Sequence, residues 1–231
     1  AYFSNKINPA LPKEVKEAIN KKLDKVEIRI SKEKSKIFFI DYVEPKIHAT
    51  PLGTDCGPDS SKYKLLGIKW LSFPVTYFIG ASNSGLDPLE AKNAVVKALN
   101  TWDAEEHPSG VFFSEVLNPA NAKLLIGWNS IDGFGGVLAI TSTTYNIITK
   151  EILSSSITFD SSDPWAVYPA LSCSSQGFAF DLENVAAHEV GHVVGLDHPK
   201  GTTNVALTMY GFASQGETHK RTLGTGDKLG I

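Results

Sequence analysis

The spacing of apolar and polar positions divides the chain into a small N-terminal unit and a larger body. Residues 12–23 place apolar side chains on one helical stripe and lysines on the other, which predicts a short surface helix. Residues 26–30 alternate strictly and residues 37–43 form a second apolar run, so a two-stranded hairpin is expected next. A helix and one hairpin have too little core to stand alone. We therefore expect their apolar faces to rest on the rest of the chain.

The larger body has the pattern of an α+β domain. A helix is predicted to start at Asp87, because this N-cap precedes a proline and Glu90 completes a capping box, and to run to about Glu106. Another helix is expected at 182–194. Short apolar runs predict strands at 74–80, 111–113, 124–128, 137–141 and 157–159. One long helix between the first two strands indicates a twisted, mostly parallel sheet.

The helix at 182–194 carries the candidate chemistry. His188 and His192 lie one turn apart, with Cβ atoms about 5–6 Å apart, so both imidazoles can reach one ion. Glu189 sits about 100° round the helix and can hold a metal-bound water without being a ligand. Gly195 ends the helix, after which His198 can return as a third ligand. Three protein nitrogens leave one tetrahedral position open, which marks a catalytic zinc site.

Five stretches carry a resemblance to a known family. Residues 188–198 resemble the H-E-x-x-H-x-x-G-x-x-H signature of the metzincin zinc endopeptidases. Residues 206–210 are similar to the family's Met-turn, whose methionine, here Met209, forms an apolar floor beneath the ion. Residues 132–139 resemble the D-G-x-G-G-x-L-A run of the matrixins, the matrix-metalloprotease branch. The first strand and last helix of a matrixin domain are similar to residues 69–77 and 223–231.

The resemblance implies a metzincin-type catalytic domain over residues 62–231, with a twisted five-stranded mixed sheet, a long backing helix and the zinc helix. Residues 1–61 would be an N-terminal extension or pro-segment, joined through a linker rich in proline and glycine. The implied function is an exported zinc-dependent endopeptidase that uses a zinc-bound water, with Glu189 as general base. The sequence of residues 216–223 resembles the corresponding stretch of archaeal matrixin-like proteases. The alternative is a non-catalytic peptide-binding module that keeps the zinc fold, against which the intact Glu189 argues.

The resemblance also implies that Val137, Leu138 and Ala139 line the cleft and bind the main chain of a peptide or protein substrate. As an edge strand, this stretch would offer unpaired N–H and C=O groups for that purpose. Asp132, with nearby glycine carbonyls, could hold Ca²⁺, although a tight turn explains it equally well. Ile140 stands where matrixins have a histidine for a structural zinc, so that second zinc is expected to be absent.

Charge is unevenly placed along the chain. The net charge of −3 gives no reason to expect nucleic acid or a membrane as partner, and we expect a monomer. Residues 1–50 hold 11 Lys and Arg against 7 Asp and Glu, a net of +4, whereas residues 51–231 carry a net of −7. Opposite charges favour docking modestly and in a salt-dependent way. The N-terminal segment is therefore expected to pack on the body and restrain its activity; an extension that only completes the core is the alternative.

The two cysteines, Cys56 and Cys173, permit one disulfide, which suits a secreted protein. No signal peptide is visible, and the sequence opens at Ala1 as a processed product would. Residues 56–59 also resemble the P-R-C-G-x-P-D cysteine switch of matrixin propeptides, whose thiolate occupies the open position of the zinc. They depart from it by an aspartate in place of the arginine and by one missing residue. A disulfide, a switch and unpaired cysteines all stay open.

Overall fold

A computed structural model gives the structure of the chain over residues 7–43, 59–103, 113–171, 177–201 and 204–231. Its helices are α1 (Lys13–Asn20), α2 (Pro88–Trp102), α3 (Leu182–Val194) and α4 (Thr225–Leu229), with 3-10 turns at Pro119–Asn121 and His219–Arg221. Its strands are β1 (Lys25–Arg29), β2 (Lys34–Val43), β3 (Lys64–Leu65), β4 (Val75–Ile79), β5 (Phe113–Glu115), β6 (Leu124–Asn129), β7 (Val137–Asn146), β8 (Ile152–Asp160), β9 (Trp165–Ala166), β10 (Phe180–Asp181), β11 (Leu196–Asp197) and β12 (Phe212–Ala213). Over these ranges no helix is long and apolar enough to cross a membrane.

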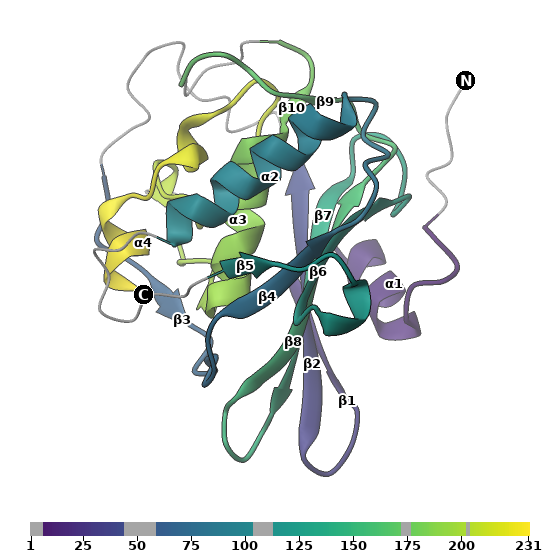
Figure 1. Ribbon diagram of the computed structural model, residues 1–231, viewed down its shortest axis with the longest axis vertical. Helices are drawn as coiled ribbons and strands as arrows, with labels where there is room; N and C mark the ends of the chain where they lie inside the picture. The colour runs from purple at the N-terminus through teal and green to yellow at the C-terminus, as the bar shows by residue number, and fades with distance from the viewer. Residues whose placement is uncertain (1–6, 44–58, 104–112, 172–176, 202–203) are drawn as a thin grey trace.

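One large mixed sheet organises the molecule (Figure 1). Its strand order is β1-β2-β7-β8-β6-β4-β5, and β12 pairs with β2 beside this path. Strands β4 to β8 form the five-stranded mixed sheet expected of the body: β5, β4, β6 and β8 are parallel neighbours, and β7 is antiparallel to β8. The long helix α2 connects β4 to β5, as predicted.

The N-terminal hairpin extends this sheet. β2 pairs antiparallel with β7 from Lys34 opposite Asn146 to Tyr42 opposite Val137, and β1 pairs antiparallel with β2. The prediction that residues 137–141 form a short edge strand is therefore wrong, because β7 reaches Asn146 and β2 covers it along its length. The covering strand comes from the far N-terminal part of the chain, which no local pattern around residue 137 reveals.

Helices cover both faces of the sheet (Figure 1). α2 and α3 pack on one face, where the larger core cluster includes Trp102 and Phe159. α1 packs on the other face, where a second cluster joins its Val15 and Ile19 to Ile140 of β7. The apolar stripe of the N-terminal helix is thus buried against the body, as its pattern predicted.

The strands β7 and β8 extend beyond the predicted ranges. The parts that the prediction missed are rich in serine and threonine. Hydroxyl groups pair across the two strands: Ser142 Oγ lies 2.8 Å from Ser156 Oγ, and Thr143 Oγ1 lies 2.9 Å from Ser155 Oγ. Such strands show no alternation of apolar residues, since their hydroxyl side chains form hydrogen bonds with one another and do not pack into an apolar core.

Several predicted features lie outside the described residues. They are the linker up to residue 58, the last turn predicted for the first long helix, residues 111–112, and both cysteines, Cys56 and Cys173. The disulfide and the cysteine switch therefore stay predictions.

Candidate metal centre and catalytic site

Helix α3 positions the candidate metal ligands. It begins at the N-cap Asp181, whose carboxylate accepts the Asn184 N–H at 2.8 Å, and ends at Gly195 with a φ of 109°. A left-handed residue at a helix end favours glycine. Every residue from Leu182 to Val193 is buried. The helix is therefore enclosed on all sides, and not on one apolar arc alone, which fixes its polar side chains as firmly as its apolar ones.

Three imidazole rings converge beside this helix. The Nε2 of His198 lies 3.1 Å from the Nε2 of His188 and 3.1 Å from that of His192. The Nδ1 of His188 faces the Thr208 carbonyl oxygen at 2.6 Å, and the Nδ1 of His192 faces the Leu196 carbonyl oxygen at 2.9 Å. Because a carbonyl only accepts, both Nδ1 atoms carry the proton and both Nε2 atoms present lone pairs. Converging lone pairs suit a metal cation.

The carboxylate of Asp41, on β2, completes this cluster. Its Oδ1 lies 2.9 Å from His198 Nε2 and 3.1 Å from His188 Nε2, and its Oδ2 lies 3.6 Å from His192 Nε2. One ligand atom from each of the four buried side chains lies within 4.8 Å of all the others. Tetrahedral zinc with bonds of about 2.0–2.2 Å keeps its ligand atoms about 3.3 Å apart. The cluster therefore fits a zinc ion.

Burial keeps two of the histidines in the form that binds metal. It lowers the pKa of His188 to about 3 and also lowers the pKa of His192, so both rings are neutral at pH 7. His198 differs: burial acts against its charge, but the carboxylates of Asp41 and Asp24 raise its pKa to about 9. The two carboxylates therefore favour a positive charge at His198 itself.

Glu189 lies next to the cluster and is completely buried. Thr141 of β7 donates a hydrogen bond to its Oε2 at 2.5 Å, while its Oε1 has no hydrogen-bond partner within the described ranges. Burial, followed by the charge of Asp41, raises the pKa of Glu189 well above the usual carboxyl range. A carboxyl group anchored through one oxygen and unsatisfied at the other can exchange a proton with a group bound beside it.

Met209 packs against α3 at Gly191, between the two helix histidines in sequence. A Cβ atom on Gly191 would lie 2.1 Å from the Met209 Sδ, so only glycine allows this approach. Asp227 of α4 holds the methionine turn, because its carboxylate accepts the N–H groups of Thr208 at 2.7 Å and of Met209 at 3.1 Å. The same turn presents the Thr208 carbonyl that fixes the tautomer of His188.

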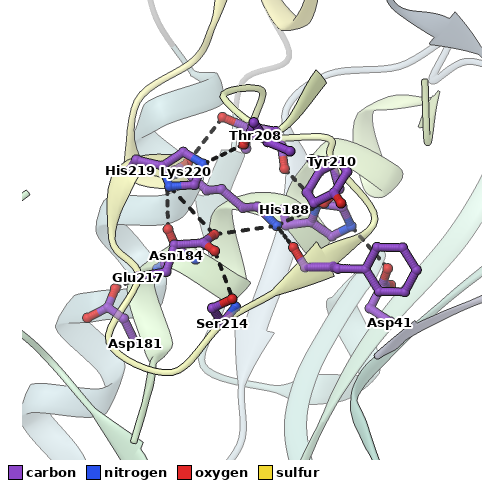
Figure 2. Close-up of polar contacts among 12 residues, drawn as sticks. Asp41, Asp181, Asn184, His188, Thr208, Tyr210, Ser214, Glu217, His219 and Lys220 are labelled. Atoms are coloured by element: carbon purple, nitrogen blue, oxygen red, sulfur yellow. Dashed lines mark hydrogen bonds and ion pairs between the residues drawn. The ribbon is translucent and has the colours of Figure 1, made fainter. Parts of the chain in front are cut away.

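A buried ammonium group braces the segment after this turn (Figure 2). Lys220 is 1% exposed, and its Nζ donates to the carbonyl oxygens of Tyr210, at 2.8 Å, and Phe212. The Glu217 carboxylate lies 3.6 Å from the same Nζ. His219 is buried, and its Nε2 faces a carbonyl oxygen at 2.8 Å. These contacts fix the course of the chain into β12.

The predicted substrate-binding residues lie at the start of β7. Val137, Leu138 and Ala139 are all buried, and the register with β2 sets Asp41 opposite Ala139. In this structure β2 therefore occupies the side of β7 that was expected to be open.

Asp132 belongs to a group of three buried carboxylates. Asp132 Oδ1 accepts the Val137 N–H at 2.9 Å, Asp160 Oδ2 accepts the Asp132 N–H at 3.0 Å, and Asp163 Oδ1 accepts the Gly135 N–H at 2.8 Å. Burial, with the charges of Asp160 and Asp132, raises the pKa of Asp163 to about 7. Its Oδ2 is buried without a hydrogen-bond partner in the described part of the chain. The turn accounts for Asp132, and the Oδ2 of Asp163 stays unsatisfied.

Sequence reasoning missed three residues of the site. Asp41 gave one signal, because it is a carboxylate inside the apolar run at 37–43. Thr141 and Asp227 gave none, since a strand threonine and an aspartate in the first turn of a helix are both commonplace.

Comparison with known proteins points to one family. A sequence model described as Matrixin matches residues 69–231. Karilysin of Tannerella forsythia is 30% identical over 166 residues, which are 68% of this chain and 32% of that protein. The hatching enzyme of Paracentrotus lividus is 32% identical over 153 residues, 62% of this chain and 23% of that protein. Matrix metalloproteinase-20 of Homo sapiens is 30% identical over 167 residues, 67% of this chain and 30% of that protein. The matched part thus spans less than a third of each relative.

Proposed function

Because the chain belongs to the matrixin family, we propose that it is a zinc-dependent endopeptidase that hydrolyses peptide bonds of proteins or peptides. The observation that carries the proposal is the convergence of three imidazole nitrogens beside the buried carboxyl group of Glu189. His188, His192 and His198 would hold the zinc. The buried, hydrogen-bonded Glu189 counts against a non-catalytic binding module.

Zinc, when bound, supplies Lewis-acid activation of water and of the substrate carbonyl group. The chain's contribution begins with orientation. The carbonyl oxygens of Thr208 and Leu196 hold His188 and His192 in one tautomer and one ring plane. Both rings are buried, which keeps bulk water away from them.

Glu189 moves the proton in this proposal. Its carboxylate takes a proton from the attacking water as the water oxygen bonds to the peptide carbon. It then gives that proton to the nitrogen of the leaving amine as the carbon–nitrogen bond breaks. The hydrogen bond from Thr141 holds Oε2, which leaves Oε1 for both transfers.

We assign the substrate main chain to the start of β7, at Val137, Leu138 and Ala139. An extended peptide can add to a strand through alternating backbone hydrogen bonds. β2 does so here, in the antiparallel direction. A substrate needs the same N–H and C=O groups, so β2 must leave before a substrate binds.

Removal of the metal tests the proposed function. The intact chain and the chain cut within residues 44–58 are each freed of metal with a chelator and assayed on an unfolded protein substrate. We expect hydrolysis to fall to background and to return with a single equivalent of zinc, measured as metal content beside activity. Hydrolysis that survives complete metal removal would refute a metallopeptidase. Zinc binding without hydrolysis in either form would support the binding module.

Calcium binding at Asp132, Asp160 and Asp163 is a further part of the proposal. Carboxylate and carbonyl oxygens are the ligands that Ca²⁺ prefers. Its support is the burial of these carboxylates and the unsatisfied Oδ2 of Asp163.

The raised pKa of Asp163, about 7 against 3.8 ordinarily, predicts a pH effect on stability. The folded state then binds more protons than the unfolded state between about pH 4 and 7, so this group removes stability as the pH rises through that window. In calcium-free buffer we expect Asp163→Asn to gain about 4 kcal/mol over wild type between pH 4 and pH 8, from urea unfolding. Added Ca²⁺ should reverse the order at pH 8 by stabilising wild type alone. A pH-independent difference between the two proteins would contradict the assignment.

Export is also proposed. It rests on Cys56 and Cys173, because disulfides persist in oxidising compartments. The mass of the alkylated, unreduced protein tells whether the two are joined.

A further inference from the structure

A cavity of about 700 Å³ adjoins His198 and continues the course of β2. Residues 135–136, directly before β7, line the cavity, and so do residues 210–212, which lead into β12. β2 ends in the same lining, at Val43. Because Asp41 lies at the candidate metal ligands, a peptide that pairs with β7 in the direction of β2 places its residues C-terminal to the metal in this cavity.

Lysine side chains dominate the charge of the cavity. Lys22, Lys64 and Lys200 line it, against one acidic side chain, Asp24. Lys22 and Asp24 belong to the N-terminal segment, so they leave with β2 before a substrate binds. Of the lining that the structure describes, the body then keeps two cationic side chains and no carboxylate.

The charge of Lys64 is already balanced. Its Nζ lies 2.6 Å from Oδ2 of Asp197, and the Nζ of Lys25 lies 2.6 Å from the same oxygen. Burial acts to raise the pKa of Asp197, but hydrogen bonds from these two lysines lower it to about 2. Asp197 is therefore ionised at neutral pH, and it still neutralises Lys64 once Lys25 has left.

The charges of Lys200 and Lys62 are not balanced in this way. Both side chains are exposed, and the Nζ of Lys62 lies 4.0 Å from the place that a Cβ atom on Gly201 would occupy, next to Lys200. Within the described ranges no carboxylate forms an ion pair with either ammonium group. Residues 51–231 as a whole carry a net charge of −7, so these two lysines reverse the sign of the charge locally.

We propose that Lys62 and Lys200 select peptides that carry acidic side chains on the C-terminal side of the bond to be cut. A carboxylate bound in the cavity meets an ammonium group at short range, whereas the rest of the body presents mostly negative charge. Exposed ion pairs are individually weak, so each lysine should favour an acidic peptide over a neutral one by up to about fivefold. The cleavage rests on the proposed function, but the binding preference does not.

Two matched sets of peptides test this selection. All peptides are blocked at both termini and share one apolar core; one set ends in Glu-Glu, Gln-Gln or Lys-Lys, and the mirrored set begins with the same pairs. The zinc-loaded chain cut within residues 44–58 gives kcat/KM for each peptide. Its Glu189→Gln variant gives Kd, from the fluorescence polarisation of labelled peptides. At low salt we expect the peptide that ends in Glu-Glu to exceed the one that ends in Lys-Lys by at least about fivefold in kcat/KM and in affinity. The mirrored set should differ less.

Substitution of the two lysines separates their effect from the general charge of the protein. Lys62→Gln and Lys200→Gln together should bring the Glu-Glu and Lys-Lys peptides to within about twofold of each other, and Lys200→Glu should reverse their order. Lys150→Gln is the matched control, because it removes the same charge from an exposed lysine in the turn between β7 and β8. It should keep the preference of wild type. Circular dichroism checks that all variants are folded.

Three results would each overturn the inference: equal affinity for the Glu-Glu and Lys-Lys peptides, a preference that survives the double substitution, or an equal preference in the mirrored set. Failure of the proposed function would look different. In that case the peptide that ends in Glu-Glu would bind more tightly than the others while no peptide was hydrolysed.

Discussion

Replacing Glu189 by glutamine or alanine is expected to lower kcat/KM by about 10²–10⁴-fold, the usual contribution of a general base. The loss follows from the position of this carboxyl group, which is buried beside three imidazoles and tethered through one oxygen to Thr141. Zinc content should stay that of wild type, because Glu189 is not one of the four side chains whose ligand atoms cluster together. The assay uses the form of the chain that hydrolyses the substrate.

The thermal stability of the two Glu189 variants serves as the control for their loss of activity. Glutamine keeps an oxygen that accepts the Thr141 hydroxyl, and it removes a buried group whose pKa is raised well above its usual range. The temperature of unfolding of Glu189→Gln should therefore not fall below that of wild type. Near-normal turnover in either variant would show that another group accepts the proton. Loss of zinc would show instead that Glu189 holds the metal centre together.

The helix that carries the candidate metal ligands was the most predictable part of the molecule. The spacing of His188, Glu189 and His192 carries its own geometry, because a helix turn brings residues four apart to one side. Gly195 then ends the helix as its sequence predicted, and His198 returns toward the same point. The expected matrixin-like fold is confirmed by the family match and by the five strands β4 to β8.

Long-range pairing was not predictable in the same way. Residues 37–43 were recognised as an apolar strand, and their need for a covering surface was inferred, but nothing local indicated β7 as the partner. Asp41 is a single polar residue in that run, which reads as a solvent-facing position until the partner is known. Its role depends on histidines that lie about 150 positions later in the chain, such as His188.

Cutting the chain within residues 44–58 is expected to leave activity low until the N-terminal segment dissociates, and then to raise it by about 10²-fold or more. A cleft open in about 1% of molecules that becomes fully open gives a factor of this size. The cut alone is not sufficient because the segment is held by burial. Its largest fully buried side chains are Phe39 and Ile40, and Val15 and Ile19 of α1 are buried as well.

The free energy with which the cut segment binds the body can be estimated from these side chains. Each buried aliphatic or aromatic side chain contributes about 1.5–3 kcal/mol, and association of two separate pieces costs about 4–15 kcal/mol. Burial of Val15, Ile19, Phe39 and Ile40 therefore offsets a large part of the cost of association, and the strand pairing with β7 adds to it. The cut chain should elute in gel filtration as one species near the 25.0 kDa of the intact chain.

Dilution and added salt should both promote dissociation of the cut segment, and activity should rise as the segment leaves. Salt screens the Lys25–Asp197 ion pair and the attraction between a basic segment and an acidic body. Activity should therefore rise with ionic strength in the cut chain and change little in the intact one, where the covalent link keeps the local concentration of the segment high. Full activity immediately after the cut, with the segment still bound, would show that β2 does not block the cleft. Unfolding of the body on release would show that the segment completes the core, and the inhibitory role would then be wrong.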